Sequence, residues 1–194
     1  MNDVSLSAER ILEAAEDVLR RHGPSKANVV DVARALGVSH GSVYRHFASK
    51  ADLREAVVAR WLDRVSGPLK AIAESDAPAT LRLRQWLDEL IATKRRKVHK
   101  ESEMFEAYRA LIHESEGAIA GHVAHLSAEL GRIVADGVAR GEFAVADPAA
   151  AGRAIFAATA RFHNPAHARE WSAPDIDRAF EEVWALILAG LRKR

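Results

Sequence analysis

The chain has 194 residues, of which 48% are hydrophobic and 28% charged, and its formal net charge is +1. This composition is ordinary for a globular protein, and the length suits one sizeable core or a small module joined to a larger one. The absence of cysteine excludes disulfides and thiolate metal sites and favours the cytoplasm. We expect no signal peptide. We also expect no membrane span, because no run approaches the roughly 18 apolar residues needed to cross a bilayer.

Apolar residues recur at helical spacing along the whole chain, whereas the alternation typical of strands is nearly absent. The sequence therefore predicts an all-α fold. The first elements are expected to begin at Ser or Asn caps and, in two cases, to end at glycine. In chain order they are a helix from Ser7 to Gly23, a short helix over about 29–36 after Asn28, a third from Ser39 to near Phe47, and a fourth from Ser49 to about Ala73.

The composition changes after residue 73, and longer apolar stripes follow. These predict further helices beginning at Ala77-Pro78, around 104–112, over about 119–141, over about 148–164 and over about 175–191. The last of them has a regular i, i+3/4, i+7 stripe. The architecture is thus about nine helices, three short ones first and then longer ones.

Val29 to Phe47, VVDVARALGVSHGSVYRHF, has the pattern of a helix-turn-helix. Ala33 is small enough for a second helix to cross closely, and Gly37 can adopt the positive φ that the turn requires. Val32, Leu36, Val38 and Val43 have the spacing that locks the two helices, and Ser39 can cap the second one. Taken alone, the pattern fits a purely structural hairpin equally well.

Basic residues are more frequent around this element than elsewhere. From Arg20 to Arg64 there are nine Lys and Arg against four Asp and Glu, an excess of five (9 − 4). Such an excess suits a polyanionic partner, although it is modest.

The run ANVVDVARALGVSHGSVYRHFASKADLREAVV resembles the N-terminal domain of the TetR family of repressors, and the resemblance extends from about Ala8 to Val58. Its most specific part is the block formed by Gly37-Val38-Ser39, Gly41 to Phe47, and Ser49-Lys50 with Leu53. The sequence departs from the family pattern at Asn28, where Thr is usual, and at His40, where Lys or Pro is common. The resemblance implies a repressor that binds a palindromic operator as a homodimer and is released by a small molecule, with no cofactor and no enzymatic activity.

The resemblance also implies roles for individual residues. Ser39, His40 and Ser42, at the start of the recognition helix, would face base edges, and Arg45 would contact guanine or phosphate. Tyr44 and His46 would contact the DNA backbone, and Lys50 would bind a phosphate. The predicted DNA-binding residues are Asn28, Ser39, His40, Gly41, Ser42, Tyr44, Arg45, His46 and Lys50.

The resemblance implies that residues 1–50 form the DNA-binding domain and residues 51–194 a helical domain for effector binding and dimerisation, linked by the helix from about 49. A lipophilic or aromatic effector is expected. The predicted pocket residues are Trp86, Leu90, Phe105, Tyr108, Arg109, His113, Leu126 and Phe156. The last two helices would form a four-helix bundle with a second copy, through Ala154, Ala158, Phe180, Trp184, Ile187, Leu188 and Leu191, unless they are simply monomer core.

Other interpretations remain open from the sequence. His122 with His125, and His163 with His167, have spacings that could share a metal, but nine histidines produce such spacings by chance, so no metal is predicted. An enzyme using His122, His125 and Glu129 and a purely protein-binding helical module are the alternatives. The basic run 94–97 with Lys100 is interpreted as a solvated helix end, with a second phosphate contact as the alternative.

Overall fold

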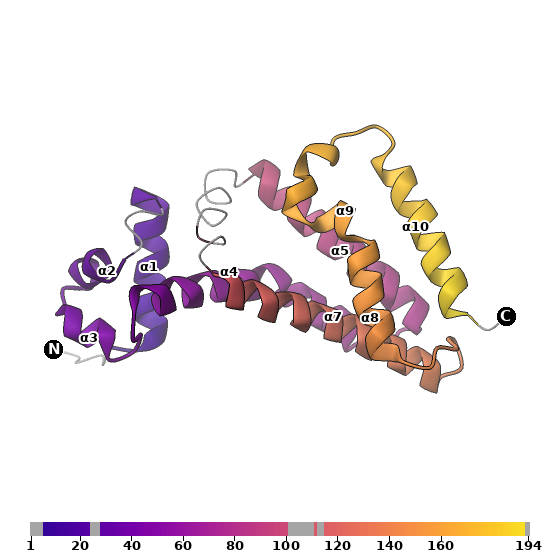
Figure 1. The fold of residues 1–194 in the computed structure, drawn as a ribbon, viewed down its shortest axis with the longest axis horizontal. Coiled ribbons are helices and arrows are strands. Elements are labelled where there is room, and N and C mark those ends of the chain that lie inside the picture. The colour runs from indigo at the N-terminus through magenta and orange to yellow at the C-terminus, as the bar shows by residue number, and fades with distance from the viewer. Residues whose placement is uncertain (1–5, 24–27, 101–110, 112–114, 193–194) are drawn as a thin grey trace. The chain divides into compact units, whose positions relative to one another are not determined.

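The computed structural model describes residues 6–23, 28–100, 111 and 115–192. Every regular element among them is a helix, so the predicted all-α class is confirmed (Figure 1). No helix in these ranges is long and apolar enough to cross a membrane. The chain divides into two compact units: unit 1 comprises residues 1–63 and 101–121, and unit 2 comprises residues 64–100 and 122–194.

Unit 1 contains α1 (Ala8–His22), α2 (Val29–Leu36), α3 (His40–Tyr44) and the first part of α4 (Lys50–Ala73). Its predicted N-caps are confirmed by hydrogen bonds from the first turn. The Ser7 hydroxyl accepts from the Arg10 amide at 3.3 Å, and the Ser49 hydroxyl accepts from the Asp52 amide at 3.1 Å. These caps satisfy amides that otherwise have no intrahelical partner, which fixes where each helix begins.

The predicted turn between α2 and α3 is built on Gly37, which has φ 67° and ψ 29°, the left-handed region that favours glycine. The amide of Val38 donates to the Ala33 carbonyl at 3.0 Å and closes the end of α2. Val32, Ala33 and Val43 are completely buried, as the helix-turn-helix pattern predicts. The crossing of α2 and α3 is therefore held by apolar contacts and by one glycine.

The third helix is shorter than predicted, because α3 ends at Tyr44 and not near Phe47. The amides of His46 and Phe47 both donate to the Val43 carbonyl, at 3.0 and 3.1 Å, which tightens the chain into a turn. Phe47 then enters the core of unit 1 with 8% of its surface exposed. The helix therefore ends before Phe47, although the apolar pattern of the sequence continues to this residue.

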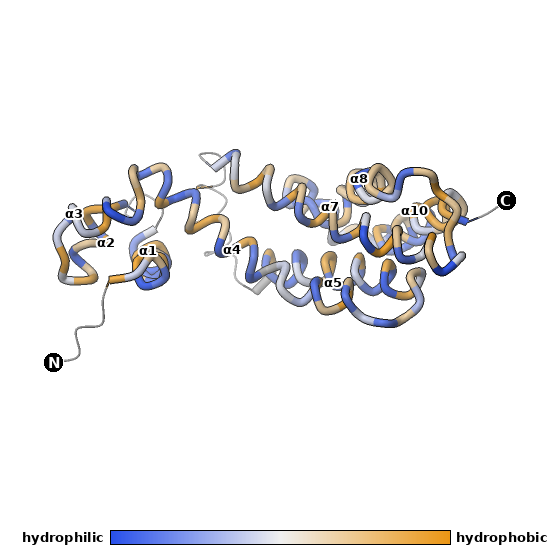
Figure 2. Tube along the Cα trace, turned by 90° about the horizontal axis from the view of Figure 1, so that it is seen from below, coloured by the Kyte–Doolittle hydropathy of each residue, from blue (hydrophilic) through white to orange (hydrophobic). Residues whose placement is uncertain are grey.

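Unit 2 contains the end of α4, most of α7 (Glu116–Ala139), and five further elements: α5 (Ala79–Lys100), α8 (Pro148–Ala158), α9 (Ala160–His163), a 3-10 helix η2 (Pro165–Glu170) and α10 (Ile176–Leu191). Hydrophobic and hydrophilic residues alternate along the long helices at helical spacing (Figure 2). Their apolar sides share one core, in which Trp86 and Leu87 are completely buried.

The helix predicted over about 148–164 is interrupted at Thr159, which separates α8 from α9. The Thr159 hydroxyl donates to the carbonyl of Ile155 at 2.9 Å and lies 3.3 Å from that of Phe156. Such bonds from a threonine to the preceding turn disturb a helix. The 3-10 helix η2 that follows was not predicted, and the helix expected around 104–112 lies outside the described residues except for Leu111.

The start of α5 depends on a residue far along the chain. The two carboxylate oxygens of Glu142 accept from the amides of Ala79 and Thr80, at 2.8 and 3.1 Å. These amide bonds, led by the one from Ala79, lower the pKa of Glu142 below its usual value. The helix therefore begins next to Ala77-Pro78, as predicted, but the residue that caps it lies in a distant segment of the chain.

Candidate nucleic-acid interface

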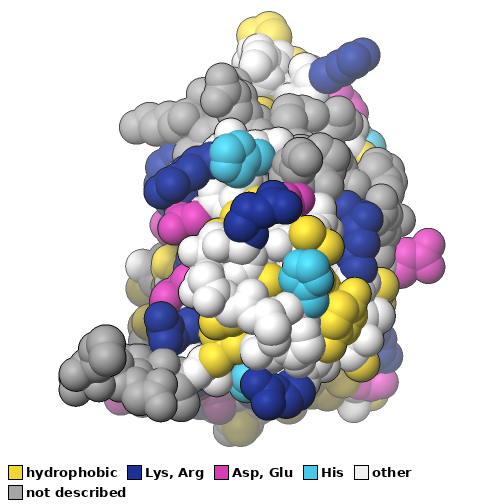
Figure 3. Space-filling view, turned by 90° about the vertical axis from the view of Figure 1, so that its left-hand side faces the viewer, with side chains coloured by type: hydrophobic (Ala, Val, Ile, Leu, Met, Phe, Trp, Pro, Cys, Tyr) yellow, Lys and Arg dark blue, Asp and Glu magenta, His cyan; other side chains and the backbone are white. Residues whose placement is uncertain are grey.

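The outer face of α3 is accessible over its whole length. Seven of the nine predicted DNA-binding residues are exposed and the other two are half-buried; the exposed ones are Ser39, His40, Gly41, Tyr44, Arg45, His46 and Lys50, and the half-buried ones are Asn28 and Ser42. Of the short helix itself only Val43 is buried. Basic and histidine side chains lie around a central area of uncharged side chains and backbone on this face of unit 1 (Figure 3). A helix with one buried anchor can present its remaining side chains to a partner.

Three side chains on this face form a hydrogen-bonded row. The hydroxyls of Ser39 and Ser42 are 2.9 Å apart, and a guanidinium nitrogen of Arg45 donates to the Ser42 hydroxyl at 3.2 Å. The Ser39 hydroxyl also accepts from the Ser42 amide at 3.2 Å, which confirms the predicted cap. The row aligns the Arg45 guanidinium along the helix, so that less rotational freedom is lost when it contacts a base or a phosphate. Sequence reasoning assigned Ser42 to base contacts and did not predict this positioning role.

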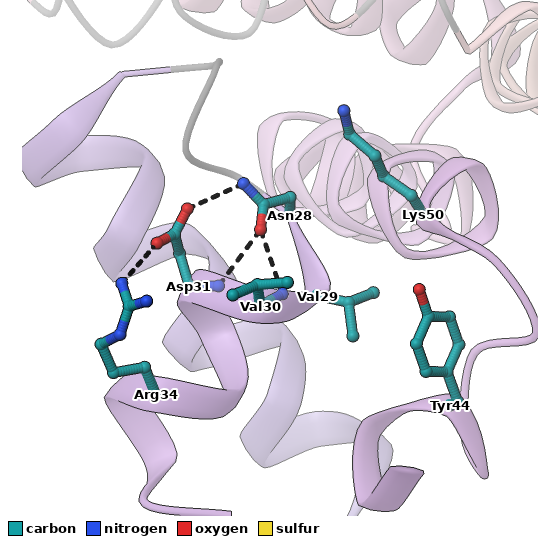
Figure 4. Close-up of a pocket in the computed structure, with 7 residues that line it drawn as sticks. All are labelled: Asn28, Val29, Val30, Asp31, Arg34, Tyr44 and Lys50. Atoms are coloured by element: carbon teal, nitrogen blue, oxygen red, sulfur yellow. Dashed lines mark hydrogen bonds and ion pairs between the residues drawn. The ribbon is translucent and has the colours of Figure 1, made fainter. Parts of the chain in front are cut away.

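A groove of about 480 Å³ lies beside the N-terminal turn of α2 (Figure 4). Tyr44 at the end of α3 and Lys50 at the start of α4 both line it, opposite residues 28–31. The Tyr44 side chain is half exposed, at 48%, although its ring is apolar. A phenol, an ammonium and a helix N-terminus around one groove are groups that bind a phosphate oxygen.

Asn28 organises the α2 side of this groove. Its side-chain oxygen accepts from the amides of Val30 and Asp31, at 3.0 and 3.1 Å, which confirms its predicted capping role. Its side-chain nitrogen donates to the Asp31 carboxylate at 2.7 Å, and that carboxylate in turn holds Arg34 at 2.9 Å. Arg34, which sequence reasoning missed, is therefore an additional cation at the groove.

Three of the predicted effector-pocket residues belong to the tightly packed core of unit 2. Trp86 and Leu90 are completely buried and Leu126 is 1% exposed, while Phe156 is half-buried against the same core. The indole nitrogen of Trp86 donates to a carboxylate oxygen of the buried Glu129 at 2.9 Å. The remaining four, Phe105, Tyr108, Arg109 and His113, lie outside the described residues, and the pocket stays a prediction.

The predicted interface residues divide into two groups. Phe180, Trp184 and Leu191 are buried in unit 2 itself, and Ile187 and Leu188 pack partly against its core. Arg84 covers the rings of Phe180 and Trp184, at 5.1 and 5.7 Å from their centroids. Ala154 and Ala158 on α8 are exposed, and Leu186 on α10, which sequence reasoning missed, is exposed by 74%.

Three of the four histidines in the two predicted pairs have other partners. His125 pairs with Glu129 at 3.3 Å, and His167 with Glu170 at 2.7 Å. His163 is buried, with its Nε2 3.3 Å from both the Thr159 hydroxyl and the Phe156 carbonyl. The part of the chain that the structure describes contains no group of three or more His, Cys, Asp or Glu able to hold a metal.

Two family descriptions match the chain. Residues 11–57 match "Bacterial regulatory proteins, tetR family", and residues 79–184 match "Tetracyclin repressor-like, C-terminal domain". An HTH-type transcriptional repressor of Mycobacterium tuberculosis is 38% identical over 74 residues, which cover 38% of this chain and 37% of the repressor. The chain thus matches little more than a third of the length of this curated relative.

Solved structures resemble the chain over nearly all of its length. RolR in complex with its ligand resorcinol superimposes with a TM-score of 0.63 at 17% identity, covering 95% of this chain and 86% of RolR. The regulator FadR of Bacillus subtilis in complex with stearoyl-CoA superimposes with a TM-score of 0.56 at 17% identity, covering 96% and 100%. At these identities the likeness is one of fold.

Proposed function

The chain belongs to the TetR family of bacterial transcriptional regulators, and from this premise we propose that it is a repressor that binds a palindromic operator as a homodimer in the cytoplasm and is released by a small-molecule effector. The observation that carries the proposal is the exposed face of α3, with the Ser39–Ser42–Arg45 row beside the groove of Tyr44 and Lys50. The family match favours a regulator over the enzyme and the protein-binding module.

The N-terminal end of α3 would enter the major groove, because a recognition helix presents its first residues to base edges. Ser39 and His40 then read bases, and Arg45 donates to guanine or to a nearby phosphate. Tyr44, His46 and Lys50 hold the DNA backbone. Contacts to the DNA backbone set the register and supply most of the affinity, whereas contacts to bases set the sequence preference.

Dimerisation would use α8 and α10 in unit 2. A two-fold operator requires a two-fold protein, and an isologous interface needs an apolar surface that the monomer does not bury itself. Leu186 on α10 and the exposed Ala154 and Ala158 on α8 provide such a surface. Small side chains on α8 also allow close approach of a partner helix.

The effector would be a lipophilic or aromatic small molecule bound within unit 2, between the helices that carry Trp86, Leu126 and Phe156. RolR was solved with resorcinol and FadR with stearoyl-CoA, so this fold accommodates ligands of different size. Their low identity to this chain carries no ligand over; what supports the proposal is the largely apolar interior.

Replacing Lys50 by alanine should weaken binding to operator and to random DNA by the same factor. Lys50 is exposed at the helix start beside the groove and would neutralise one phosphate, so the slope of log K against log salt should fall by about one. Fluorescence anisotropy with both DNAs over a range of salt concentrations measures this. Lys70→Ala, an exposed lysine of the same helix, serves as the control and should leave the slope unchanged.

Ser42→Ala supplies the complementary result. Without the Ser42 hydroxyl, Arg45 loses its support, and the ratio of operator to random affinity should fall while the salt slope stays. If Lys50→Ala altered this ratio and left the salt slope intact, the assignment of α3 as the recognition helix would be wrong.

A further inference from the structure

Three nitrogen-bearing side chains from three helices interact electrostatically inside unit 2, where a hydrogen bond from Trp86 of α5 to Glu129 joins α5 to α7. Lys94 is on α5, His122 on α7 and His163 on α9; Lys94 is 8% and His163 3% exposed, and both ring nitrogens of His122 are shielded from solvent. The Lys94 ammonium is near enough to act on both rings: the pKa of His122 is lowered to about 3 and that of His163 to about 4, by burial first and by this charge among the further causes. They form one cluster, called here the Lys94 cluster.

The Lys94 cluster has no counter-charge among the described residues. No carboxylate in the described ranges forms an ion pair with Lys94, and neither ring nitrogen of His122 has a hydrogen-bond partner. Two carboxylates on α7 and α5 have other partners: Glu129 accepts from Trp86, and Glu89 accepts from Thr93 at 2.7 Å. An unpaired buried cation beside an imidazole whose two nitrogens have no partner is costly, and such groups indicate a missing ligand.

The charge of the Lys94 cluster indicates which anion would fit. With their pKa values lowered, both imidazoles are neutral near pH 7, so the ammonium supplies the single positive charge. The neutral ring of His122 has one N–H to donate, whereas the Nε2 of His163 already lies 3.3 Å from the Phe156 carbonyl. A monoanion balances this charge, whereas a phosphate dianion leaves excess negative charge in the interior. The surroundings are apolar: the ring of Phe156 packs on His163 with centroids 4.6 Å apart, and the buried Leu90 lies one helical turn from Lys94.

We propose that unit 2 binds a small organic carboxylate with an apolar body, whose carboxylate is held by Lys94 and His122. The identification of this carboxylate as the effector rests on the proposed function, whereas its binding to unit 2 does not. The carboxylate supplies the acceptor oxygens that Lys94 and His122 lack, and the apolar body contacts the neighbouring core side chains. The proposal thus narrows the effector from lipophilic molecules in general to lipophilic acids.

Benzoate and octanoate are suitable probes, with benzamide and octanamide as neutral molecules of the same shape. Titrated into the full chain in a calorimeter, the two carboxylates should bind at least about tenfold more tightly than their amides, because only they make charge-assisted hydrogen bonds. Lys94→Met keeps the length of the side chain and removes the charge, and it should abolish this preference. Lys70→Met, at an exposed lysine, should keep it. Equal binding of acid and amide, or a preference that survives Lys94→Met, overturns the proposal.

A second measurement needs no ligand. Burial lowers the pKa of Lys94 to about 8 from 10.5, so between these values the unfolded chain holds a proton at this residue that the folded chain has released. The free energy of unfolding of the wild type should therefore rise, relative to Lys94→Met, as the pH increases from about 8 to about 10. The groups facing Lys94 from the other helices, His122 and His163, are neutral throughout this range. A constant difference between the two proteins would show that the ammonium already has a partner, and would contradict the proposal.

DNA release is measured separately, by anisotropy of operator DNA with added benzoate or octanoate. Carboxylate binding at the Lys94 cluster without release of DNA would support the site and contradict the effector mechanism of the proposed function. Normal operator binding with no preference for acids over amides would contradict the carboxylate site and leave the proposed DNA binding supported.

Discussion

Gly152→Ala should destabilise unit 2 by about 1–3 kcal/mol or more, because the added methyl group meets backbone that cannot move aside. A Cβ at this position of α8 would lie 2.6 Å from the carbonyl oxygen of Ser127 and 2.7 Å from the Cα of Gly131, and closer still to the amide nitrogen of Gly131. All these atoms belong to α7. The two helices touch through their glycines, so any side chain at 152 forces them apart.

Urea unfolding followed by circular dichroism measures this effect. Gly121→Ala is the matched control, since it lies inside α7 with nothing within 4 Å of its Cβ position. There the same substitution should raise the free energy of unfolding by up to about 1 kcal/mol, because alanine is the better helix former. Opposite signs at the two positions are the expected result; a stabilised Gly152→Ala protein would show that α7 and α8 do not pack through Gly131 and Gly152.

Leu186→Glu should convert the proposed dimer into a monomer and lower operator affinity by at least about 100-fold. An apolar side chain that is 74% exposed in one chain would be buried against the second copy, and a carboxylate there would be buried without a partner, which typically costs several kcal/mol. A monomer would contact one half-site only, so loss of the proposed dimer should remove most of the affinity. Sedimentation measures the oligomeric state and anisotropy the affinity.

Leu81→Glu provides the control, because Leu81 on α5 is also exposed, by 46%, and lies outside the predicted interface. It should remain dimeric with normal affinity. A Leu186→Glu protein that is still dimeric and binds normally would place the interface elsewhere. Trp184 is a poorer target, since its ring is buried within unit 2 beneath Arg84, and a charge there would disturb the fold of each monomer.

Local features of the fold could be predicted because their causes lie within a few residues. Asn28 and Ser39 cap helices through amides two or three positions away, and Gly37 alone provides the left-handed turn. The positions of the site residues on α3 follow from the same short-range rules. Exposure of the side chains predicted to contact DNA also follows, because the short helix needs only Val43 in the core.

Features that depend on distant segments could not be predicted. Glu142 caps α5 from more than 60 residues away, and the break at Thr159 competes with a helical pattern that continues through it. The apolar stripe of α10 predicted an interface at Trp184, but a stripe does not reveal whether the same chain or a second copy covers it. Burial of Lys94 also depends on distant segments. The sequence interpretation of the basic run 94–97 as a solvated helix end is wrong for Lys94, because packing of α5 against the rest of unit 2 buries this side chain.

The most direct test of the assignment of α3 as a recognition helix is a footprint of the full chain on sites selected from random DNA. Two recognition helices related by a two-fold axis should protect a palindrome whose half-sites lie about 34–36 Å apart, or a multiple of this distance, on one side of the duplex. Binding should weaken steeply with salt. A single asymmetric half-site occupied by a monomer, or the absence of any salt-dependent affinity for DNA, would contradict the account.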